Sequence, residues 1–126
     1  AEAGLLPARP AGQTTSLPLV GAGAAGPAVR ISAAPGVHLY GSEAGEVGAL
    51  PGNARHLGGG LTVAMVRFAA RCEYARTVED VLARRSRLLF IDAALAASLA
   101  AEVGAILQEE NGRDPDAAGF RELAAT

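Results

Sequence analysis

The sequence has no lysine, no tryptophan, one cysteine, three phenylalanines and two tyrosines. A single cysteine can build neither a disulfide framework nor a zinc site with cysteine ligands. The shortage of aromatic side chains argues against an aromatic-rich β-sandwich. No apolar run approaches the roughly 18 residues of a membrane-spanning helix, and residues 1–12 do not read as a secretory signal. We therefore expect a cytoplasmic protein.

Length and charge restrict the interpretation further. A chain of 126 residues has room for one domain that buries its own core without disulfides or metals. All 11 basic residues are arginine, yet the formal net charge is −2. Such a chain has no overall positive field that would favour nucleic acid or an anionic membrane.

Glycine and proline are concentrated in the first 60 residues, which hold six of the seven prolines. We predict a flexible linker over residues 1–20, followed by a helical domain over residues 21–126. Within this domain Ser42 is expected to cap a short helix that ends at Leu50. Residues 53–60 are predicted to form a loop.

Residues 61–75 repeat apolar side chains at helical spacing, at Leu61, Met65, Phe68, Cys72 and Ala75. This spacing predicts a helix in which Cys72 is a small buried hydrophobe. A second helix is expected to begin at Thr77, because Thr77 and Asp80 resemble a capping box with aspartate at its third position. Its buried stripe is predicted at Val78, Val81, Leu82 and Leu89.

Two further helices follow. Asp92 is expected to cap a helix that ends at Asn111-Gly112, and Asp114-Pro115 to open a last helix that runs to about Ala124. Their core contacts are predicted to come from Leu95, Leu99, Val103, Ile106, Phe120 and Leu123. The predicted fold class is all-α, a small bundle of four to five helices behind a flexible, Gly/Pro-rich N-terminal segment.

The pattern G-x-G-x-x-G occurs at Gly21, Gly23 and Gly26. A dinucleotide-binding turn needs a strand before it, a full-length helix after it and a return strand. Here Pro35-Gly36 ends any helix after about two turns, and no β-branched run supplies a second strand. We interpret the pattern as an accident of composition.

Other candidate sites are weak. His38 and His56 lie in or beside predicted loops without a third ligand at metal spacing, so both are expected to face solvent. Glu109 and Glu110 end a helix and are expected to have no partner. The sequence shows no nucleophile–base pair, and we assign no catalytic, cofactor-binding or metal-binding residue.

Residues 71–92, RCEYARTVEDVLARRSRLLFID, carry a family resemblance. They resemble the C-terminal helical domain of FAD-dependent (aerobic) glycerol-3-phosphate dehydrogenases and the related α-glycerophosphate oxidases. TTSLPLVGA at 14–22 is similar to the family's linker from the catalytic domain. LYGSEAGEV at 39–47 is similar to a helix junction of the family, with Leu39 in place of the usual basic residue.

The resemblance implies the detached C-terminal domain of a bacterial enzyme that oxidises glycerol 3-phosphate to dihydroxyacetone phosphate. FAD would be bound by an N-terminal flavin domain of the parent, with electrons passed to quinone or to oxygen. The isolated chain is expected to bind no cofactor and to be inactive. The parent is expected to be cytoplasmic, with peripheral contact at the inner face of the membrane and its oligomeric state left open.

The role implied for this chain is structural. The residues expected to fix helix orientation or a domain interface are Thr77, Glu79, Asp80, Arg84, Arg85 and Arg87. We predict that Arg84 or Arg85 pairs with Asp80, Glu73 or a carboxylate of the helix that begins after Asp92.

An alternative from another class is a free-standing module that uses the Thr77–Arg87 helix to bind nucleic acid or a protein partner. The negative net charge and the single three-arginine cluster argue against nucleic acid, because specific DNA binders usually present a broad basic surface.

Overall fold

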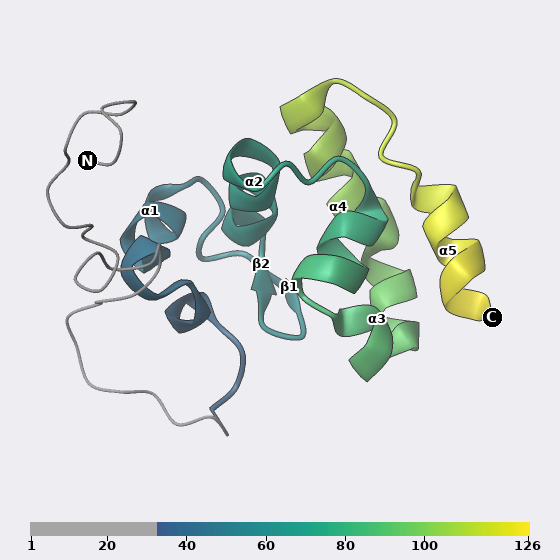
Figure 1. The fold of residues 1–126 in the computed structure, drawn as a ribbon, viewed down its shortest axis with the longest axis horizontal. Coiled ribbons are helices and arrows are strands. Elements are labelled where there is room, and N and C mark those ends of the chain that lie inside the picture. The colour runs from purple at the N-terminus through teal and green to yellow at the C-terminus, as the bar shows by residue number, and fades with distance from the viewer. Residues whose placement is uncertain (1–32) are drawn as a thin grey trace, which may run out of the picture.

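The computed structural model describes residues 33–126 (Figure 1). The elements are, in chain order, η2 (Val37–Glu43), α1 (Ala44–Ala49), β1 (His56–Gly58), β2 (Leu61–Thr62), α2 (Val63–Cys72), η3 (Asp80–Arg85), α3 (Leu88–Ile91), α4 (Ala93–Asn111) and α5 (Ala117–Ala125). The prediction of a helical fold is confirmed for this part of the chain. The predicted linker over residues 1–20 and the glycine pattern lie outside the described residues.

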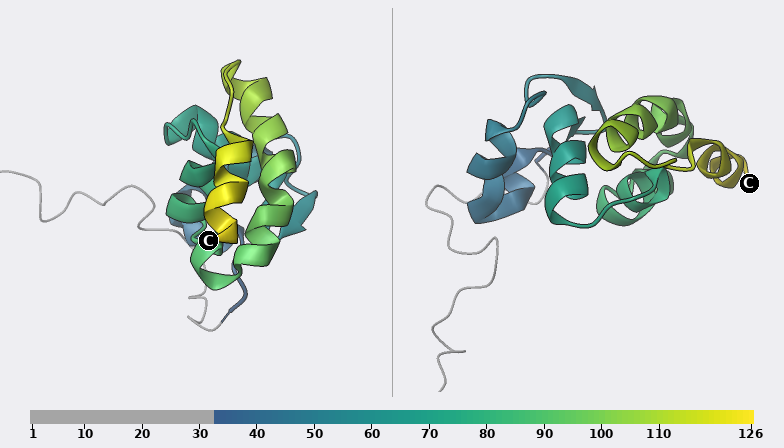
Figure 2. Two further views of the ribbon diagram at one scale, coloured as in Figure 1. Left: turned by 90° about the vertical axis from the view of Figure 1, so that its right-hand side faces the viewer. Right: turned by 90° about the horizontal axis from the view of Figure 1, so that it is seen from above.

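The helices pack side by side from α1 at one end of the domain to α5 at the other (Figures 1 and 2). Helix α2 packs between α1 and α4, and α4 in turn contacts α3, η3 and α5. One hydrophobic core runs through these layers, and its largest fully buried apolar side chains include Leu82, Leu107, Val47 and Val66. Helix α4 therefore contacts α2, α3 and α5, while α1 packs on α2.

A small antiparallel hairpin of β1 and β2 stands where the sequence predicted a loop and the first turn of a helix. Gly59 and Gly60 make the turn with positive φ, as does the preceding Gly58 at the end of β1, and Gly60, at φ 83°, lies against Pro35. Leu61 and Thr62 therefore belong to the hairpin, and α2 begins at Val63. Thr62 caps α2, since its side-chain oxygen accepts from the backbone N–H of Met65 at 3.3 Å.

The prediction that Cys72 is buried is wrong, because its side chain is exposed. Cys72 is the last residue of α2, and the chain leaves the helical path immediately after it. Tyr74 adopts a left-handed conformation at φ 60°, which returns Ala75 to the core. The N–H of Ala75 donates to the carbonyl of Ala69 at 3.0 Å. The helical spacing predicted from the sequence fails once the helix has ended.

Helix α1 differs from its prediction at the start. It begins at Ala44 with Glu43 as its N-cap residue, and no side chain caps it, so Ser42 does not take the predicted role. Gly41, at φ 58°, makes a non-helical kink inside the preceding 3₁₀-helix η2, which leads directly into α1. Val47 is the fully buried contact of this short helix.

Both predicted ends of α4 are confirmed. The Asp92 carboxylate accepts from the N–H of Leu95 at 3.0 Å, and Gly112, at φ 67°, forms the C-cap. Besides the predicted stripe, α4 buries a second row at Ala96, Ala100, Gly104 and Leu107. Two faces are covered because α2 and α5 both pack on this helix.

Helix α5 is capped by Asp116, not by Asp114 as predicted. The Asp116 carboxylate accepts from the N–H of Gly119 at 3.2 Å, while Asp114 accepts from the N–H of Asp116 at 2.9 Å. The Pro115 carbonyl accepts from the N–H of Val78 at 2.9 Å. This tertiary contact holds Pro115 outside the helix. Phe120 is buried as predicted, whereas Leu123 is 44% exposed.

Candidate functional site

The segment that resembles the family signature, residues 71–92, contains a reciprocal cap. The N–H of Asp80 donates to the Thr77 side-chain oxygen at 3.2 Å. In return, the Asp80 carboxylate accepts from the N–H groups of Thr77 at 3.1 Å and Arg76 at 2.9 Å. The predicted capping role of Thr77 is confirmed, and aspartate takes the place of the usual glutamate.

These contacts change the acidity of Asp80. Desolvation by burial acts to raise the pKa of Asp80, but the N–H groups of Arg76 and Thr77, with the Arg84 guanidinium, outweigh it and lower the pKa. Hydrogen bonds to the charged form stabilise that form. The carboxylate is therefore held ionised as part of the cap.

Replacing Thr77 by alanine should lower the free energy of unfolding by about 1 kcal/mol, because the N–H of Asp80 loses its side-chain acceptor and keeps only the Thr77 carbonyl. Urea unfolding followed by circular dichroism measures this cost. Thr77→Ser, which keeps the hydroxyl, serves as the control and should retain most of the stability. An equal loss in the two variants would contradict the capping role.

The arginines after the cap are paired inside the domain. Arg84 contacts the carboxylates of Asp80 and Glu79, the latter at 3.2 Å. Arg85 lies 3.8 Å from the Glu73 carboxylate and donates to the Glu73 backbone carbonyl at 2.6 Å. The predicted pairing is confirmed for both residues. The Arg85 contacts join the π-turn region to Glu73, the C-cap residue of α2.

The helix that carries these arginines is a π-helix over Asp80–Arg85, a feature that the sequence did not reveal. The N–H and the hydroxyl of Ser86 both donate to the carbonyl of Val81, at 2.8 and 2.9 Å. Inserted π-turns are rare and often occur at functional sites. Here the wider turn exposes Arg84 and Arg85 while Val81 and Leu82 stay buried.

Two exposed aromatic rings flank the π-helix. Tyr74 lies before it, with the Arg76 guanidinium 5.8 Å from its ring centre, and Phe90 follows it, with Arg87 at 5.9 Å. Tyr74 and Arg87 both have left-handed backbones, which cost energy for residues other than glycine. The segment therefore presents arginine and aromatic side chains together at the surface.

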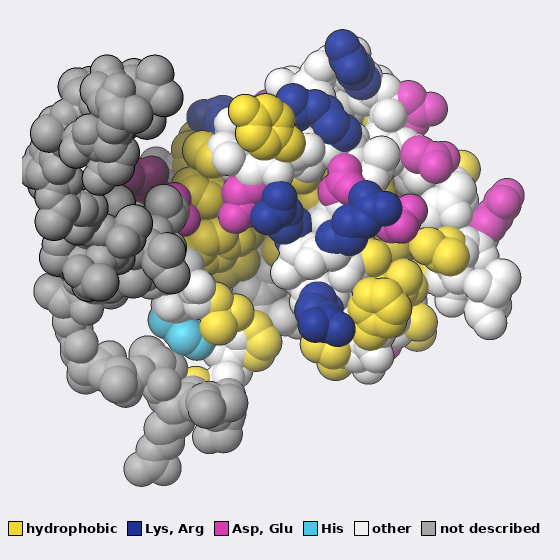
Figure 3. Space-filling view, in the orientation of Figure 1, with side chains coloured by type: hydrophobic (Ala, Val, Ile, Leu, Met, Phe, Trp, Pro, Cys, Tyr) yellow, Lys and Arg dark blue, Asp and Glu magenta, His cyan; other side chains and the backbone are white. Residues whose placement is uncertain are grey.

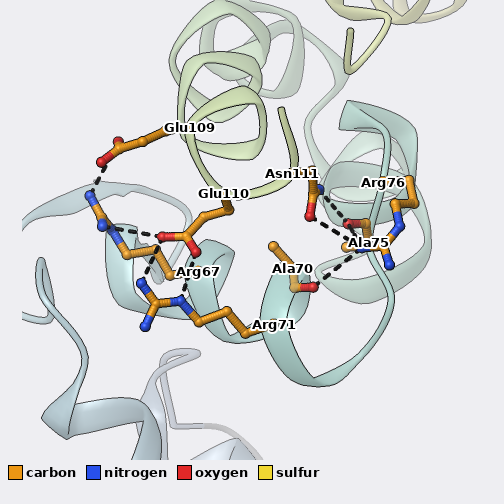
Figure 4. A network of polar contacts seen from close by, with 8 residues as sticks. All are labelled: Arg67, Ala70, Arg71, Ala75, Arg76, Glu109, Glu110 and Asn111. Carbon is orange, nitrogen blue, oxygen red and sulfur yellow. Dashed lines mark hydrogen bonds and ion pairs between the residues drawn. The ribbon is translucent and has the colours of Figure 1, made fainter. Parts of the chain in front are cut away.

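A second ion-pair cluster joins α2 to the end of α4 (Figure 4). Glu110 accepts from Arg71 at 2.6 and 3.0 Å, and Arg67 lies 3.3 Å from Glu110 and 3.5 Å from Glu109. The expectation that these two glutamates have no partner is wrong. The Arg71 guanidinium lowers the pKa of Glu110, against the opposing effect of desolvation. Residues some 40 positions apart supply the partners, so no local pattern indicates them.

Asn111 fixes the loop between α2 and η3 (Figure 4). Its amide nitrogen donates to the Ala75 carbonyl at 3.0 Å, and its amide oxygen accepts from Arg76 at 3.2 Å. Arg76 also donates to the Ala70 carbonyl at 3.4 Å. The last residue of α4 thus acts as a bridge to the signature segment.

A groove of about 780 Å³ opens beside the π-helix. Its apolar lining comes from η2, β2, α2 and α3, with Glu73, Arg84 and Arg85 on its polar side. Tyr40 packs edge-on against Phe68 with ring centres 5.4 Å apart. Burial raises the pKa of Tyr40 to about 12, and Glu73 and Glu43 act in the same direction. The groove has the volume of a ligand pocket.

Among residues 33–126, no group of three or more His, Cys, Asp or Glu side chains is placed to hold a metal ion. His38 and His56 are exposed, as predicted. The two strands of the described sheet form an antiparallel hairpin, which cannot supply the parallel βαβ turn of a dinucleotide site. No helix in the described part of the chain has the length and apolar character needed to span a bilayer.

Comparison with known proteins places this fold in a family. The sequence pattern of the family described as the C-terminal domain of alpha-glycerophosphate oxidase matches residues 12–118. Since the match covers most of the chain, the chain belongs to this family, and the resemblance is confirmed.

A relative from yeast agrees with this membership. The chain is 45% identical over 54 residues to the mitochondrial glycerol-3-phosphate dehydrogenase of Schizosaccharomyces pombe. The shared stretch covers 43% of this chain and 8% of that protein, so the chain corresponds to a small part of the relative's length. No solved structure matches the chain.

Proposed function

We propose that this chain is the C-terminal structural domain of an FAD-dependent glycerol-3-phosphate dehydrogenase or oxidase. The observation that supports it most is the family match over residues 12–118. Residues 1–20 would be the linker from the catalytic domain, and residues 21–126 the helical domain. The chain alone would be non-catalytic.

The parent enzyme would oxidise glycerol 3-phosphate to dihydroxyacetone phosphate. FAD would accept the two electrons and pass them to quinone or to oxygen. The similarity to the yeast glycerol-3-phosphate dehydrogenase supports this substrate. The cofactor would be held by an N-terminal flavin domain, because the described part of this chain has only a two-stranded antiparallel sheet.

The role proposed for the signature segment is to hold helices in a fixed orientation or to support an interface with the flavin domain. Thr77, Glu79, Asp80, Arg84, Arg85 and Arg87 are the residues proposed for this role. Support comes from the pairing of Arg84 and Arg85 with carboxylates of their own domain. Arginines paired in this way also make a poorer phosphate-binding surface, which weighs against nucleic acid as the partner. Bacterial origin, a cytoplasmic location and peripheral membrane contact of the parent remain predictions from the resemblance.

The proposal is tested first on the chain alone. The purified chain should show no flavin absorbance and should not reduce a dye when glycerol 3-phosphate is added. The gene region that encodes it should also encode a flavin domain upstream, and that longer protein should be yellow and active. Flavin bound by the chain alone, or turnover by it, would overturn the non-catalytic role.

The structural role is tested in the longer protein. Replacing Arg84 and Arg85 together by alanine should lower its melting temperature while KM for glycerol 3-phosphate stays unchanged. Arg113→Ala, at another exposed arginine, is the matched control and should leave both values unchanged. A raised KM without a loss of stability would instead place the two arginines in substrate binding.

A further inference from the structure

The groove beside the π-helix exposes large apolar side chains. Leu39 and Ile91 line it with 69% and 75% of their surfaces exposed, and Met65, Leu61 and Leu88 form deeper parts of the lining. In Figure 3 hydrophobic side chains gather in a recess beside a cluster of arginine and acidic side chains. Exposed apolar surface rimmed by charged side chains is a candidate binding site for another segment or molecule.

The described chain begins at this groove. Pro35 and Gly36 belong to its lining. Pro35 is also held in place, because its carbonyl oxygen lies 2.5 Å from the position that a Cβ on Gly60 would occupy. A larger residue than glycine would not fit between the hairpin and Pro35. Ala33, the first described residue, therefore stands two residues before the lining of the groove.

The residues just before Ala33 are part of the family match. The family match begins at residue 12, whereas the described structure begins at residue 33, so 33 − 12 = 21 matched residues precede it. The large apolar residues nearest to the groove along the chain are Val29 and Ile31, which stand on either side of Arg30. Ile31 stands four residues before Pro35 and cannot be more than about 14 Å from it.

We propose that residues 29–31 of this chain occupy the groove, with Val29 and Ile31 on its apolar lining and Arg30 directed to solvent. In an extended segment, alternate side chains point to opposite faces, which suits this apolar–charged–apolar order. The tether to Pro35 is short, so little chain entropy is lost when the segment docks. The inference rests on the groove and on the family match, and is independent of the parent's activity.

Methyl NMR on the full chain tests the contact directly. The sequence contains one methionine, Met65, and three isoleucines, Ile31, Ile91 and Ile106, so a methyl-labelled sample gives few, assignable signals. The Ile31 methyl should show NOE cross-peaks to the methyl of Met65 or Ile91, which line the groove. It should show none to Ile106, which is buried elsewhere in α4. Absence of cross-peaks from Ile31 to both groove residues would overturn the proposal.

A variant pair supplies the second readout. Val29→Asp combined with Ile31→Asp should shift the methyl signals of Met65 and Ile91, and leave Ile106 unchanged. Leu5→Asp with Leu6→Asp, upstream of the family match, is the matched control and should shift none of the three. Unchanged Met65 and Ile91 signals in the first variant would contradict the docking of residues 29–31.

A second copy of the chain is the main competing occupant. In a mixed sample, one portion of the protein carries labelled isoleucine and the other labelled methionine. Intramolecular docking predicts that the cross-peak from Ile31 to Met65 disappears in this mixture. A cross-peak that persists would show that the segment comes from another molecule, and would overturn the proposal.

Discussion

Replacing Leu107 by alanine should lower the free energy of unfolding by about 3 kcal/mol. Leu107 is fully buried in α4, the helix on which α2, α3 and α5 all pack. Removing most of its side chain leaves a cavity in the core, and the helices that pack on α4 cannot easily close it because each is also held by other contacts. The lost stability then has two parts, the hydrophobic free energy of the removed atoms and the cost of the cavity that they leave.

Equilibrium unfolding in urea, followed by circular dichroism, measures this effect. Leu123→Ala in α5 is the matched control, because the same atoms are removed from a side chain that is 44% exposed. Its cost should be below about 1 kcal/mol. If the two variants lose similar stability, α4 is not the centre of a cooperative core.

Replacing Asp80 by alanine should cost about 2 kcal/mol at neutral pH. The change removes the acceptor for the N–H groups of Arg76 and Thr77 and one carboxylate partner of Arg84. Asp80→Asn keeps a side-chain oxygen and loses the charge, so it should retain part of this stability. An Asp80→Ala variant as stable as the natural chain would show that the Asp80 contacts do not stabilise this segment.

The same carboxylate gives the stability a defined dependence on pH. Its pKa in the folded protein is lowered from the ordinary 3.8, so folding favours the charged form. Between the folded-state pKa and the ordinary pKa, the unfolded state binds more protons than the folded state. The contribution of Asp80 to stability is therefore fully present above the ordinary pKa and is lost as the pH falls through the folded-state pKa. The Asp80→Ala variant should therefore lose less stability than the natural chain on acidification from about pH 5 to about pH 2. Parallel curves for the two proteins would contradict this linkage.

Glu110 makes the stability depend on pH in the same direction as Asp80. Arg71 lowers its pKa from the ordinary 4.5, so its contribution is also lost in acid. The acid sensitivity of the Asp80→Ala variant should therefore be reduced and not abolished. Glu110→Gln added to that variant should reduce it further, as measured by the same unfolding curves.

Features built from neighbouring residues could be predicted from the sequence. The caps by Asp92 and Gly112 and the box of Thr77 with Asp80 are as expected, because each joins atoms within four residues. The pairing of Arg84 with Asp80 also follows from adjacent helical turns. The family resemblance over residues 71–92 has the same local character, since it rests on a contiguous stretch of residues.

Features that join distant segments were decided by the tertiary structure. Arg71 meets Glu110 across 39 positions, and Asn111 reaches the Ala75 carbonyl across 36. The Val78 contact with the Pro115 carbonyl moves the cap of α5 to Asp116. By itself the sequence determined the helical class, most helix positions and the family, because periodicity and capping act over one or two turns. Which helix ends meet, where α2 stops and which apolar surface stays open depend on packing between segments, and only the folded chain brings those segments together.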